Sequence, residues 1–389
     1  MKKIAIIISD PLSDRKGQLN AELNRIRYLI DEKEFCVDVF NFSTYEGPLT
    51  RFLRKTEKLS IDSIIEIDGI KINCFWRRFS LIDYVLEVKM HLFPIINRDW
   101  PKRYVNIFKQ YDIISAHSFE GGIIAKWINE KYGIPYYVTW HGSDIHTGPF
   151  RSIIRQNETK QIIECAAVNF FVSNALLLIS DTFAPYKNKM VLYNGADKSF
   201  TRFNDTIRKQ LRVKYSVSST KVIAFVGNLF DVKNPLSLVP IFKKVKDNTS
   251  ESLSFWIIGD GKYRNDVAMA ASAMSLEVTF WGNQPVDIMP EIMNCIDVLV
   301  LPSKNEGLPL VAVEALSCGV NVVGSNVGGI SEVVGIENVF ELGEDFIDKI
   351  SSRIIEMLEG KVVQTLGEQF SWSVTSKIET KVYQGKINY

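Results

Sequence analysis

The stretch that decides the fold reads SKNEGLPLVAVEALSCG and spans residues 303–319. It follows the apolar run IDVLVL at residues 296–301, which predicts a buried strand. Pro309 suits the first position of a helix, because a proline has no N–H that would need a partner there. Gly319 ends that helix, and the apolar residues after it begin another strand. This succession of strand, turn, helix and strand is typical of a parallel α/β sheet.

Two carboxylates belong to this stretch. Glu306 lies in the turn before the helix, and Glu314 lies inside the helix. The free N–H groups of Gly307, Leu308 and Leu310 are expected to point out of the helix mouth, and such exposed amides form an anion site. An anion site beside a carboxylate suits a ligand with a phosphate at one end and hydroxyl groups at the other. A sugar nucleotide fits that description.

Composition narrows the class of protein. The 389 residues are too many for one ordinary domain and right for two, and the hydrophobic fraction of 46% is enough for two cores. The formal net charge of +1 disfavours a nucleic-acid partner, since such proteins usually carry a large positive excess. The five cysteines show no paired spacing, which argues against a disulfide framework or a zinc site.

The sequence also bears on location. Lys2 and Lys3 precede an apolar run, but that run is too short for a signal peptide and Asp10 interrupts it, so a first strand is expected instead. No apolar run approaches the roughly 20 residues needed to span a bilayer. The expectation is a cytoplasmic protein that lies against the inner face of a membrane at most.

Strands alternate with helical stretches along the whole chain, which predicts an α/β fold with parallel sheets. The polar stretch 200–221 is expected to link two Rossmann-like domains. The predicted domains are residues 1–200 and 201–369, followed by a terminal helix at 370–389. The predicted strands are residues 3–8, 36–40, 113–116, 136–140, 169–172, 190–193, 222–226, 253–258, 278–280, 298–301 and 321–324.

The strand, Glu-Gly turn and Glu-bearing helix resemble the signature of retaining glycosyltransferases with the GT-B fold, especially those of family 4. Glu306 and Glu314 match the two glutamates of that signature. The resemblance implies two Rossmann-like domains that face each other across a cleft. It also implies that the terminal helix, with Val374, Ile378 and Val382 at helical spacing, crosses back to the first domain.

The segment AFVGNLFDVKNP, residues 224–235, resembles the family's first strand and loop of the second domain. In the family a Gly-Arg pair and a later Lys hold the donor diphosphate. Gly227 and Lys233 match, whereas Asn228 stands where an Arg is usual. An amide can donate to a phosphate oxygen but brings no charge, so either donor binding is weaker or a nearby cation, Lys262 or Arg264, supplies the charge.

Two further loops fit the same pattern. Gly259 begins a Gly-Asp-Gly turn after a strand, as in the family, although a Gly-x-Gly alone is weak evidence. Gly282 closes the next strand, in a loop that usually lies along the nucleobase. Trp281 beside it serves either that loop or core packing. The backbone around Leu308, Pro309 and Leu310 is assigned to the donor by the same resemblance.

The first half of the chain carries a strand that ends in His-Gly-Ser-Asp and resembles the family's acceptor-domain loop. The resemblance implies that His141 hydrogen-bonds a hydroxyl of the donor sugar. The position suits a ligand, because open α/β sheets bind ligands at the carboxyl ends of strands. His117, after another strand, is expected to form a second wall. Gly17 follows the first strand, where the family often has a Gly close to the donor.

Cations lie beside aromatic residues at 50–55 and 75–79, followed by Lys89, His91 and Phe93. One interpretation is ordinary solvated charges over core aromatics. The other is a surface that meets an anionic membrane or a lipid-diphosphate acceptor.

The resemblance implies transfer of a hexose-type sugar from a nucleoside-diphosphate donor to a hydroxyl of a glycan or lipid-linked acceptor, in polysaccharide or cell-envelope glycan biosynthesis. Catalytic roles fall to Glu306, His141 and Lys233, and Glu314 holds the ribose. No metal and no other cofactor is expected, because no Asp-x-Asp motif lies beside a strand end. Two alternatives remain open. One is a nucleotide-sugar epimerase on the same fold, and the other is a non-catalytic GT-B partner subunit that binds carbohydrate.

Overall fold

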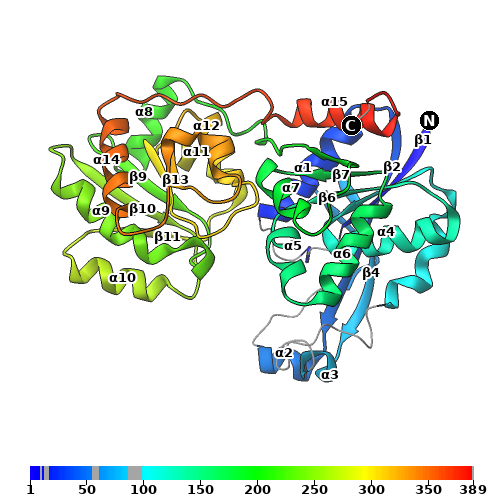
Figure 1. The fold of residues 1–389 in the computed structure, drawn as a ribbon. Helices are drawn as coiled ribbons and strands as arrows, with labels where there is room; N and C mark the ends of the chain where they lie inside the picture. Colours follow the sequence, from blue (N-terminus) through cyan, green and yellow to red (C-terminus); the bar gives the residue numbers. More distant parts are fainter. Residues whose placement is uncertain (9–10, 13–16, 55–60, 86–98, 388–389) are drawn as a thin grey trace. The chain divides into compact units, whose positions relative to one another are not determined.

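The computed structural model describes residues 1–8, 11–12, 17–54, 61–85 and 99–387 (Figure 1). The chain forms two compact units. Unit 1 comprises Met1–Val172, Leu176–Leu192 and Thr375–Tyr389, and unit 2 comprises Ser173–Ala175 and Tyr193–Val374.

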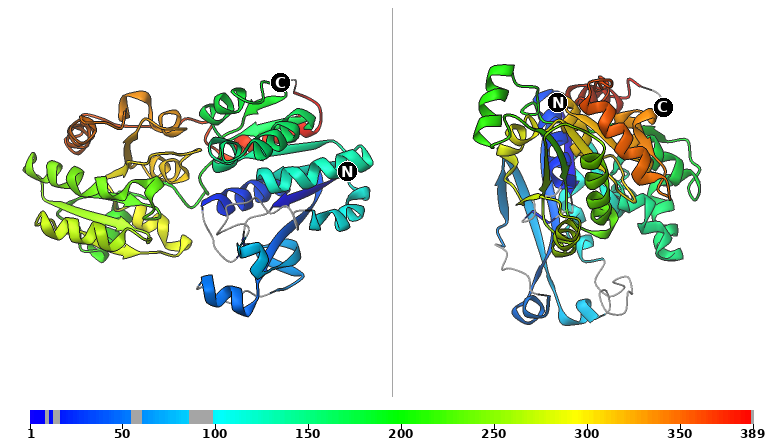
Figure 2. Two further views of the ribbon diagram at one scale, coloured as in Figure 1. Left: turned by 60° about the horizontal axis from the view of Figure 1, so that its bottom comes forward. Right: turned by 90° about the vertical axis from the view of Figure 1, so that its left-hand side faces the viewer.

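Unit 1 contains an eight-stranded sheet in the order β3-β4-β2-β1-β5-β6-β7-β8. All neighbouring strands are parallel except β3 and β4. Figure 2 shows helices along this sheet, among them α1 (Gly17–Asp31), α4 (Ser118–Tyr132) and α6 (Ile153–Cys165). The strands are β1 (Lys2–Ile8), β2 (Phe35–Glu46), β3 (Ile64–Ile67), β4 (Ile70–Phe79), β5 (Ile113–His117), β6 (Tyr136–Trp140), β7 (Val168–Phe171) and β8 (Lys189–Val191).

The hairpin of β3 and β4 was not predicted from the sequence. Its turn is Asp68-Gly69, and both residues have positive φ, at 51° and 80°. Asp-Gly between two apolar segments is a strong hairpin signal, so the sequence did contain the information. The strand β2 also runs on to Glu46, beyond its predicted end at Phe40, because it pairs in parallel with β4 from Ile72 to Phe79.

Unit 2 contains a six-stranded parallel sheet in the order β11-β10-β9-β12-β13-β14. The chain starts at β9 in the middle, builds outward to β11, and returns to the other side with β12. The switch point of the sheet therefore lies between β9 and β12. The strands are β9 (Lys221–Val226), β10 (Leu253–Ile258), β11 (Thr279–Gly282), β12 (Val298–Leu301), β13 (Asn321–Ser325) and β14 (Val339–Phe340).

A large apolar cluster helps to hold unit 2 together. Helices α9 (Leu238–Asp247) and α14 (Phe346–Leu358) contribute Phe242 and Ile354 to it, against Phe225 of β9 and Phe255 of β10. All four side chains are at most 3% exposed. The expected α/β class with parallel sheets and crossover helices is confirmed.

The predicted link at residues 200–221 is wrong, because this stretch contains helix α8 (Asp205–Lys214) of unit 2. Asn204 caps the helix by accepting a hydrogen bond from the N–H of Ile207 at 2.9 Å. The helix is charged because only Leu211 is buried. The chain enters unit 2 earlier, at Tyr193.

The terminal helix α15 (Trp372–Tyr383) returns to unit 1 from residue 375 onward, and Val382 and Tyr383 join the core of that unit. Its Glu379 forms a buried ion pair with Arg25 of α1, with Arg25 Nε 2.8 Å from Glu379 Oε2. The Tyr383 hydroxyl donates to Glu379 Oε1 at 2.5 Å. Among the described residues, no helix is long and apolar enough to cross a membrane.

Candidate functional site

The loops that follow the strands of unit 2 meet at the carboxyl edge of its sheet. Backbone hydrogen bonds tie them together in the order of the strands. The N–H of Gly259, after β10, donates to the carbonyl of Gly282 at the end of β11, and the N–H of Leu229, after β9, donates to that of Asp260. The N–H of Lys304, after β12, donates to the carbonyl of Val232 at 2.7 Å. Ligands of open α/β sheets bind at this edge, at the switch point.

Glycine is required where these loops touch. A Cβ on Gly259 would lie 2.1 Å from the carbonyl oxygen of Gly227, and Gly259 has a φ of 122°. Gly227 and Gly282 also have positive φ, at 156° and 66°. Three of the glycines that the sequence assigned to the donor, Gly227, Gly259 and Gly282, therefore lie together, and their positions have a structural reason of their own.

The loop after β13 packs against the turn Glu306-Gly307 in the same way. A Cβ on Gly328 would lie 1.7 Å from the carbonyl oxygen of Glu306. The N–H of Gly329 donates to the carbonyl of Gly307 at 3.1 Å. The backbone of Glu306-Gly307 is thus packed directly against the neighbouring loop and cannot shift without it.

Lys233 and Glu306 form an ion pair across the switch point. Lys233 lies in η4 (Asp231–Lys233) after β9, and its Nζ donates to Glu306 Oε1. The hydroxyl of Ser303 donates to the same carboxylate oxygen at 2.9 Å. Ser303 is fully buried, and its carbonyl accepts from the hydroxyl of Ser325. Two of the three predicted catalytic residues are therefore in direct contact.

The helix mouth beside this pair has free donors. Helix α12 (Leu310–Ser317) begins one residue later than predicted, because Pro309 has an extended conformation (φ −76°, ψ 96°) and is the N-cap. A proline offers no side-chain oxygen, so the first turn has no side-chain cap. Within the described part of the chain, no hydrogen bond is recorded for the N–H groups of Gly307, Leu308 and Leu310. These amides keep the capacity to bind an anion.

Glu314 lies on α12 and is partly buried. Burial, with a smaller contribution from the nearby carboxylate of Asp197, raises the pKa of Glu314 to about 8. A carboxyl group with this pKa is largely protonated at neutral pH. It can then both donate and accept hydrogen bonds, which suits contact with a pair of hydroxyl groups.

Two other cations of these loops are paired with acids, whereas the exposed Lys262 has no recorded ion pair among the described residues. Lys304 Nζ lies 2.9 Å from Asp231 Oδ1, and Arg264 Nη1 lies 3.2 Å from Asp260 Oδ2. Asn228, by contrast, is partly buried and has no recorded side-chain hydrogen bond among the described residues. Lys304 was not predicted as a site residue. Its contacts with Asp231 and Val232 of η4 in the structure identify it as one.

Trp281 is partly buried on β11 and packs against other aromatic rings of unit 2. Its ring meets that of Trp256 edge-on at 5.2 Å and that of Tyr215 at 5.7 Å. Of the two interpretations of Trp281, the geometry favours core packing. The neighbouring Gly282 still contributes its backbone to the strand-end loops.

In unit 1, His141 lies in a buried cluster with His117 and Glu22. His141 Nε2 is 3.0 Å from His117 Nδ1 and 3.8 Å from Glu22 Oε1. The two rings are stacked at 5.2 Å, and the His141 side chain is 5% exposed. Gln18, one turn before Glu22 on α1, donates to Glu22 Oε1 at 3.3 Å and to the Ser118 hydroxyl at 2.8 Å. The predicted second wall, His117, thus contacts His141 directly.

Burial lowers the pKa of His141 to about 3, and the cationic Arg25 adds to the effect. The pKa of His117 is also well below its usual value, because of burial and then of the charges of His141 and Arg25. Both imidazoles are therefore neutral at physiological pH and share one proton between Nδ1 and Nε2. The cluster offers one ligand atom from each of Glu22, His117 and His141, within 4.8 Å of one another. The positive charge of Arg25 opposes a metal ion there.

Asp144 shapes the loop that carries His141. It accepts hydrogen bonds from the N–H groups of His141 (3.1 Å) and Gly142 (2.7 Å). Burial raises the pKa of Asp144 to about 6, although these hydrogen bonds oppose the rise. From the sequence, Asp144 was known only as part of the His-Gly-Ser-Asp motif and had no assigned role. Gly17 begins α1, and a Cβ there would meet open space, so nothing in its packing requires glycine.

Of the two interpretations of the basic and aromatic segments, the packing at residues 75–79 matches that of charges over core aromatics. Phe75 stacks on Phe42 at 4.9 Å, and Arg77 Nη2 lies 2.5 Å from the buried Asp83. Phe75 and Arg77 belong to β4, whose pairing with β2 brings the ring of Phe75 against that of Phe42. The side chain of Arg54 and the whole of Lys55, Lys89, His91 and Phe93 lie outside the described residues.

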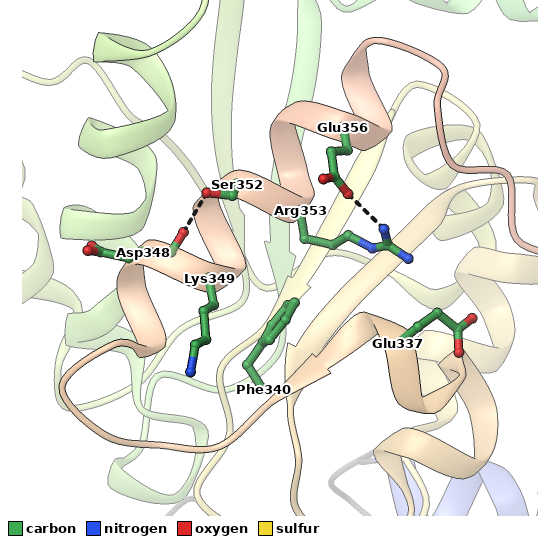
Figure 3. A pocket seen from close by; sticks show the side chains of 7 residues that line it. All are labelled: Glu337, Phe340, Asp348, Lys349, Ser352, Arg353 and Glu356. Carbon is green, nitrogen blue, oxygen red and sulfur yellow. Dashed lines mark hydrogen bonds and ion pairs between the residues drawn. The ribbon is translucent and has the colours of Figure 1, made fainter.

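A separate cavity of about 400 Å³ lies between β14 and α14 (Figure 3). Its charged groups are largely matched: Arg353 pairs with Glu356 at 2.7 Å, and Lys349 pairs with Asp345 at 3.4 Å. Asp348 is paired with Lys244. This cavity lies away from the strand ends that hold Lys233 and Glu306, so it is not the candidate site.

Residues 207–369 match the model of the family described as glycosyl transferases group 1. The chain is 25% identical over 292 residues to an uncharacterized glycosyltransferase of Methanocaldococcus jannaschii, which covers 70% of this chain and 75% of that protein. It is 26% identical over 276 residues to the UDP-Gal:alpha-D-GlcNAc-diphosphoundecaprenol alpha-1,3-galactosyltransferase of Escherichia coli, with coverage of 67% and 70%.

Solved structures show the fold. The sucrose-phosphate synthase of Thermosynechococcus elongatus superposes with a TM-score of 0.73 at 17% identity, over 99% of both chains. The HepE protein of Anabaena, solved with UDP and glucose, gives a TM-score of 0.68 at 17% identity, over 98% of this chain and 95% of that one. The GT-B fold and the resemblance to group 1 glycosyltransferases are confirmed.

Replacement of Glu314 by Gln tests the raised pKa. The folded protein binds a proton at Glu314 up to about pH 8, whereas the same carboxyl in the unfolded chain releases it near pH 4.5, so the wild type loses stability as the pH rises through this window. The variant cannot ionise there. Its melting temperature relative to wild type should therefore rise between about pH 5 and about pH 8.5 in thermal denaturation.

The exposed Glu277→Gln exchange is the matched control and should leave the pH dependence unchanged. Parallel pH profiles for Glu314→Gln and wild type would show that Glu314 is ionised at neutral pH.

Proposed function

We propose that this chain, which carries the group 1 glycosyltransferase domain on a GT-B fold, is a retaining enzyme of the family-4 type. It moves a hexose-type sugar from a nucleoside-diphosphate sugar to a hydroxyl of a glycan or lipid-linked acceptor. The observation that carries the proposal is the contact of Lys233 with Glu306 at the switch point, beside the free amides of α12. That site combines a cation, a carboxylate and aligned N–H donors, which suits a diphosphate joined to a sugar.

In the proposed mechanism, the groups that stabilise developing charge all belong to unit 2. Lys233 and the amides of Leu308 and Leu310 stabilise the negative charge that develops on the leaving diphosphate. Glu306 faces the positive charge that develops on the sugar, and Glu314 holds the ribose. The bond between the anomeric carbon and the phosphate oxygen breaks. A bond from the acceptor oxygen forms on the same face, and the leaving phosphate takes the acceptor's proton.

His141 orients the sugar in this proposal. Its imidazole is neutral, so it contributes a hydrogen bond without a charge. His117 holds one nitrogen of His141 at 3.0 Å, which leaves Nδ1 as the nitrogen for a hydroxyl group. No group in the described part of the chain is assigned as a nucleophile.

Relatives support the donor and acceptor classes. The HepE protein is solved with UDP and with UDP-glucose, and the Escherichia coli relative is named for transfer from UDP-Gal to a sugar on diphosphoundecaprenol. Another relative is named as a putative teichuronic acid biosynthesis glycosyltransferase of Bacillus subtilis. We accordingly assign the chain to polysaccharide or cell-envelope glycan biosynthesis, with no nucleic-acid partner.

The proposal needs no metal. Lys233 and the helix amides meet the diphosphate charge in unit 2, and the cluster of Glu22, His117 and His141 lies beside the cationic Arg25. Transfer is therefore to be assayed in EDTA, and rescue of a lost activity by Mg²⁺ or Mn²⁺ would contradict this part of the proposal.

Replacement of Glu306 by Gln tests the function. The variant keeps the size of the side chain and removes the charge, so transfer from nucleoside-diphosphate sugars should fall by at least about 100-fold. Product analysis separates the alternatives: an epimerase converts the donor without acceptor, and a partner subunit shows no turnover in the wild type. Circular dichroism checks that the variant is folded, and wild-type kcat in a folded variant would refute the role of Glu306.

A second test uses the missing arginine. Lys233→Ala should lose roughly 10- to 100-fold in kcat/KM, the equivalent of about 1.5–3 kcal/mol for one charge-assisted contact. Asn228→Arg should tighten the donor and partly rescue Lys233→Ala, because either cation can meet the same diphosphate. A double-mutant cycle on kcat/KM measures the coupling. Strictly additive effects would show that Asn228 does not face the diphosphate.

We further propose that unit 1 meets a lipid surface at the cytoplasmic side of an anionic membrane. Helices α2 (Pro48–Arg54) and α3 (Leu81–Asp83) follow the paired ends of β2 and β4 and lie at one end of the unit (Figures 1 and 2). Phe52 is 80% and Ile82 65% exposed, with Arg51 and Arg78 nearby in the chain. Exposed apolar side chains with neighbouring cations suit a membrane interface.

Vesicle sedimentation tests this surface. The double exchange of Phe52 and Ile82 to Ser should reduce binding to vesicles of phosphatidylglycerol and phosphatidylcholine, and added salt should weaken the remaining binding. Val213→Ser is the matched control, because Val213 is 67% exposed on α8 of unit 2. Equal sedimentation of wild type and the double variant would favour ordinary exposed residues.

A further inference from the structure

Lys233, which contacts the diphosphate in the proposed reaction, and Glu306, which faces the sugar, form an ion pair with each other. Lys233 Nζ donates to Glu306 Oε1, and the Ser303 hydroxyl donates to that same oxygen. The side chains of Lys233 and Glu306 are 28% and 11% exposed. The pair is thus screened only in part by solvent, and a diphosphate that contacts Lys233 has to compete with a carboxylate already in place.

The competition takes place at the side chains, because the backbones are fixed. The carbonyl of Glu306 lies against Gly328, and the N–H of Lys304 is held by the carbonyl of Val232. The loops after β9 and β12 therefore stay together when the ion pair opens. Rotation of the Glu306 side chain away from Lys233 is sufficient to free the cation.

We infer that Glu306 is an exchangeable counter-ion of Lys233 that lets the site discriminate an intact sugar donor from the nucleoside diphosphate it leaves behind. A nucleoside diphosphate has to displace Glu306 from Lys233 and provides no new hydrogen-bond partner for the displaced carboxylate. A nucleoside-diphosphate sugar also displaces Glu306, but its sugar hydroxyls can donate hydrogen bonds to the carboxylate. The inference rests on the proposed function for the contact of Lys233 with the diphosphate.

The exchange has a consequence for the end of the reaction. Once the sugar has left, Glu306 no longer has hydroxyl partners, and its return to Lys233 competes with the bound product. Release of the diphosphate is thereby favoured at the moment when the next donor is needed. The carboxylate of Glu306 would stabilise the developing charge on the sugar during catalysis and would then favour product release by returning to Lys233.

The test is the affinity for nucleoside diphosphates without sugar. Titration calorimetry with UDP, GDP, ADP, CDP and dTDP first identifies the diphosphate that binds the wild type. Glu306→Gln should bind that diphosphate roughly 3- to 10-fold more tightly, since Lys233 is no longer neutralised. Glu306→Ala serves as a second variant. In the Lys233→Ala background the same exchange at Glu306 should leave the affinity unchanged.

Asp231→Asn is the matched control, because it breaks the neighbouring ion pair with Lys304 across the same two loops. It should change the affinity by less than about twofold. Unchanged or weaker binding in both Glu306 variants, or equal tightening in Asp231→Asn, would overturn the inference while leaving the proposed function intact. A wild type that binds none of the five diphosphates would instead refute the proposed function.

Discussion

The arrangement of unit 2 depends on the direct contact of backbone with backbone at the carboxyl edge of its sheet. Gly259 touches the carbonyl of Gly227, and Gly328 touches that of Glu306, at distances that leave no room for a Cβ. Both glycines also have a left-handed φ, which other residues rarely adopt. Lys233 and Glu306 extend from the loops that these contacts hold, so the geometry of the charged site is set by residues that carry no charge.

Three cations of the site form ion pairs with acids of the site. Lys233 is matched by Glu306, Lys304 by Asp231 and Arg264 by Asp260. In the part of the chain that the structure describes, the amides at the mouth of α12 have no side-chain cap, since Pro309 provides none, and Lys262 has no ion pair. An anion therefore meets these fixed dipoles and Lys262, and Lys233 becomes available only as Glu306 is exchanged. This division explains how the site can lack an arginine at position 228 and still suit a diphosphate.

The sequence predicted those parts of the molecule whose information is local. The strand, turn and helix around Glu306 follow from the apolar periods and from Pro309 and Gly319, and the structure shifts the helix start by one residue. The contact of Lys233 with Glu306 could be expected because both follow strands at a switch point. That argument predicts which loops meet but not which side-chain atoms are in contact. The ion pair itself is therefore known only from the structure.

What the sequence could not predict depends on contacts between distant segments. The pairing of β2 with β4 turned Phe75 inward and gave Arg77 a partner in Asp83, whereas the sequence alone left core aromatics and an exposed basic and aromatic surface both open. Arg25 and Glu379 are 354 positions apart, and neither lies in a recognisable motif. The turn at Asp68-Gly69 is the one case in which a local signal was present and was not used.

The pair of Arg25 and Glu379 bears on the chemistry of unit 1. Glu379 contacts Arg25 through Nε, and Nη1 and Nη2 have no recorded hydrogen-bond partner among the described residues. The guanidinium therefore keeps part of its field, which together with burial holds His141 neutral. A neutral imidazole orients a hydroxyl group through a hydrogen bond and brings no net charge to the site. It follows that unit 1, with its returning helix, supplies orientation in the proposed reaction, and that the charges which lower its barrier come from the strand-end loops of unit 2.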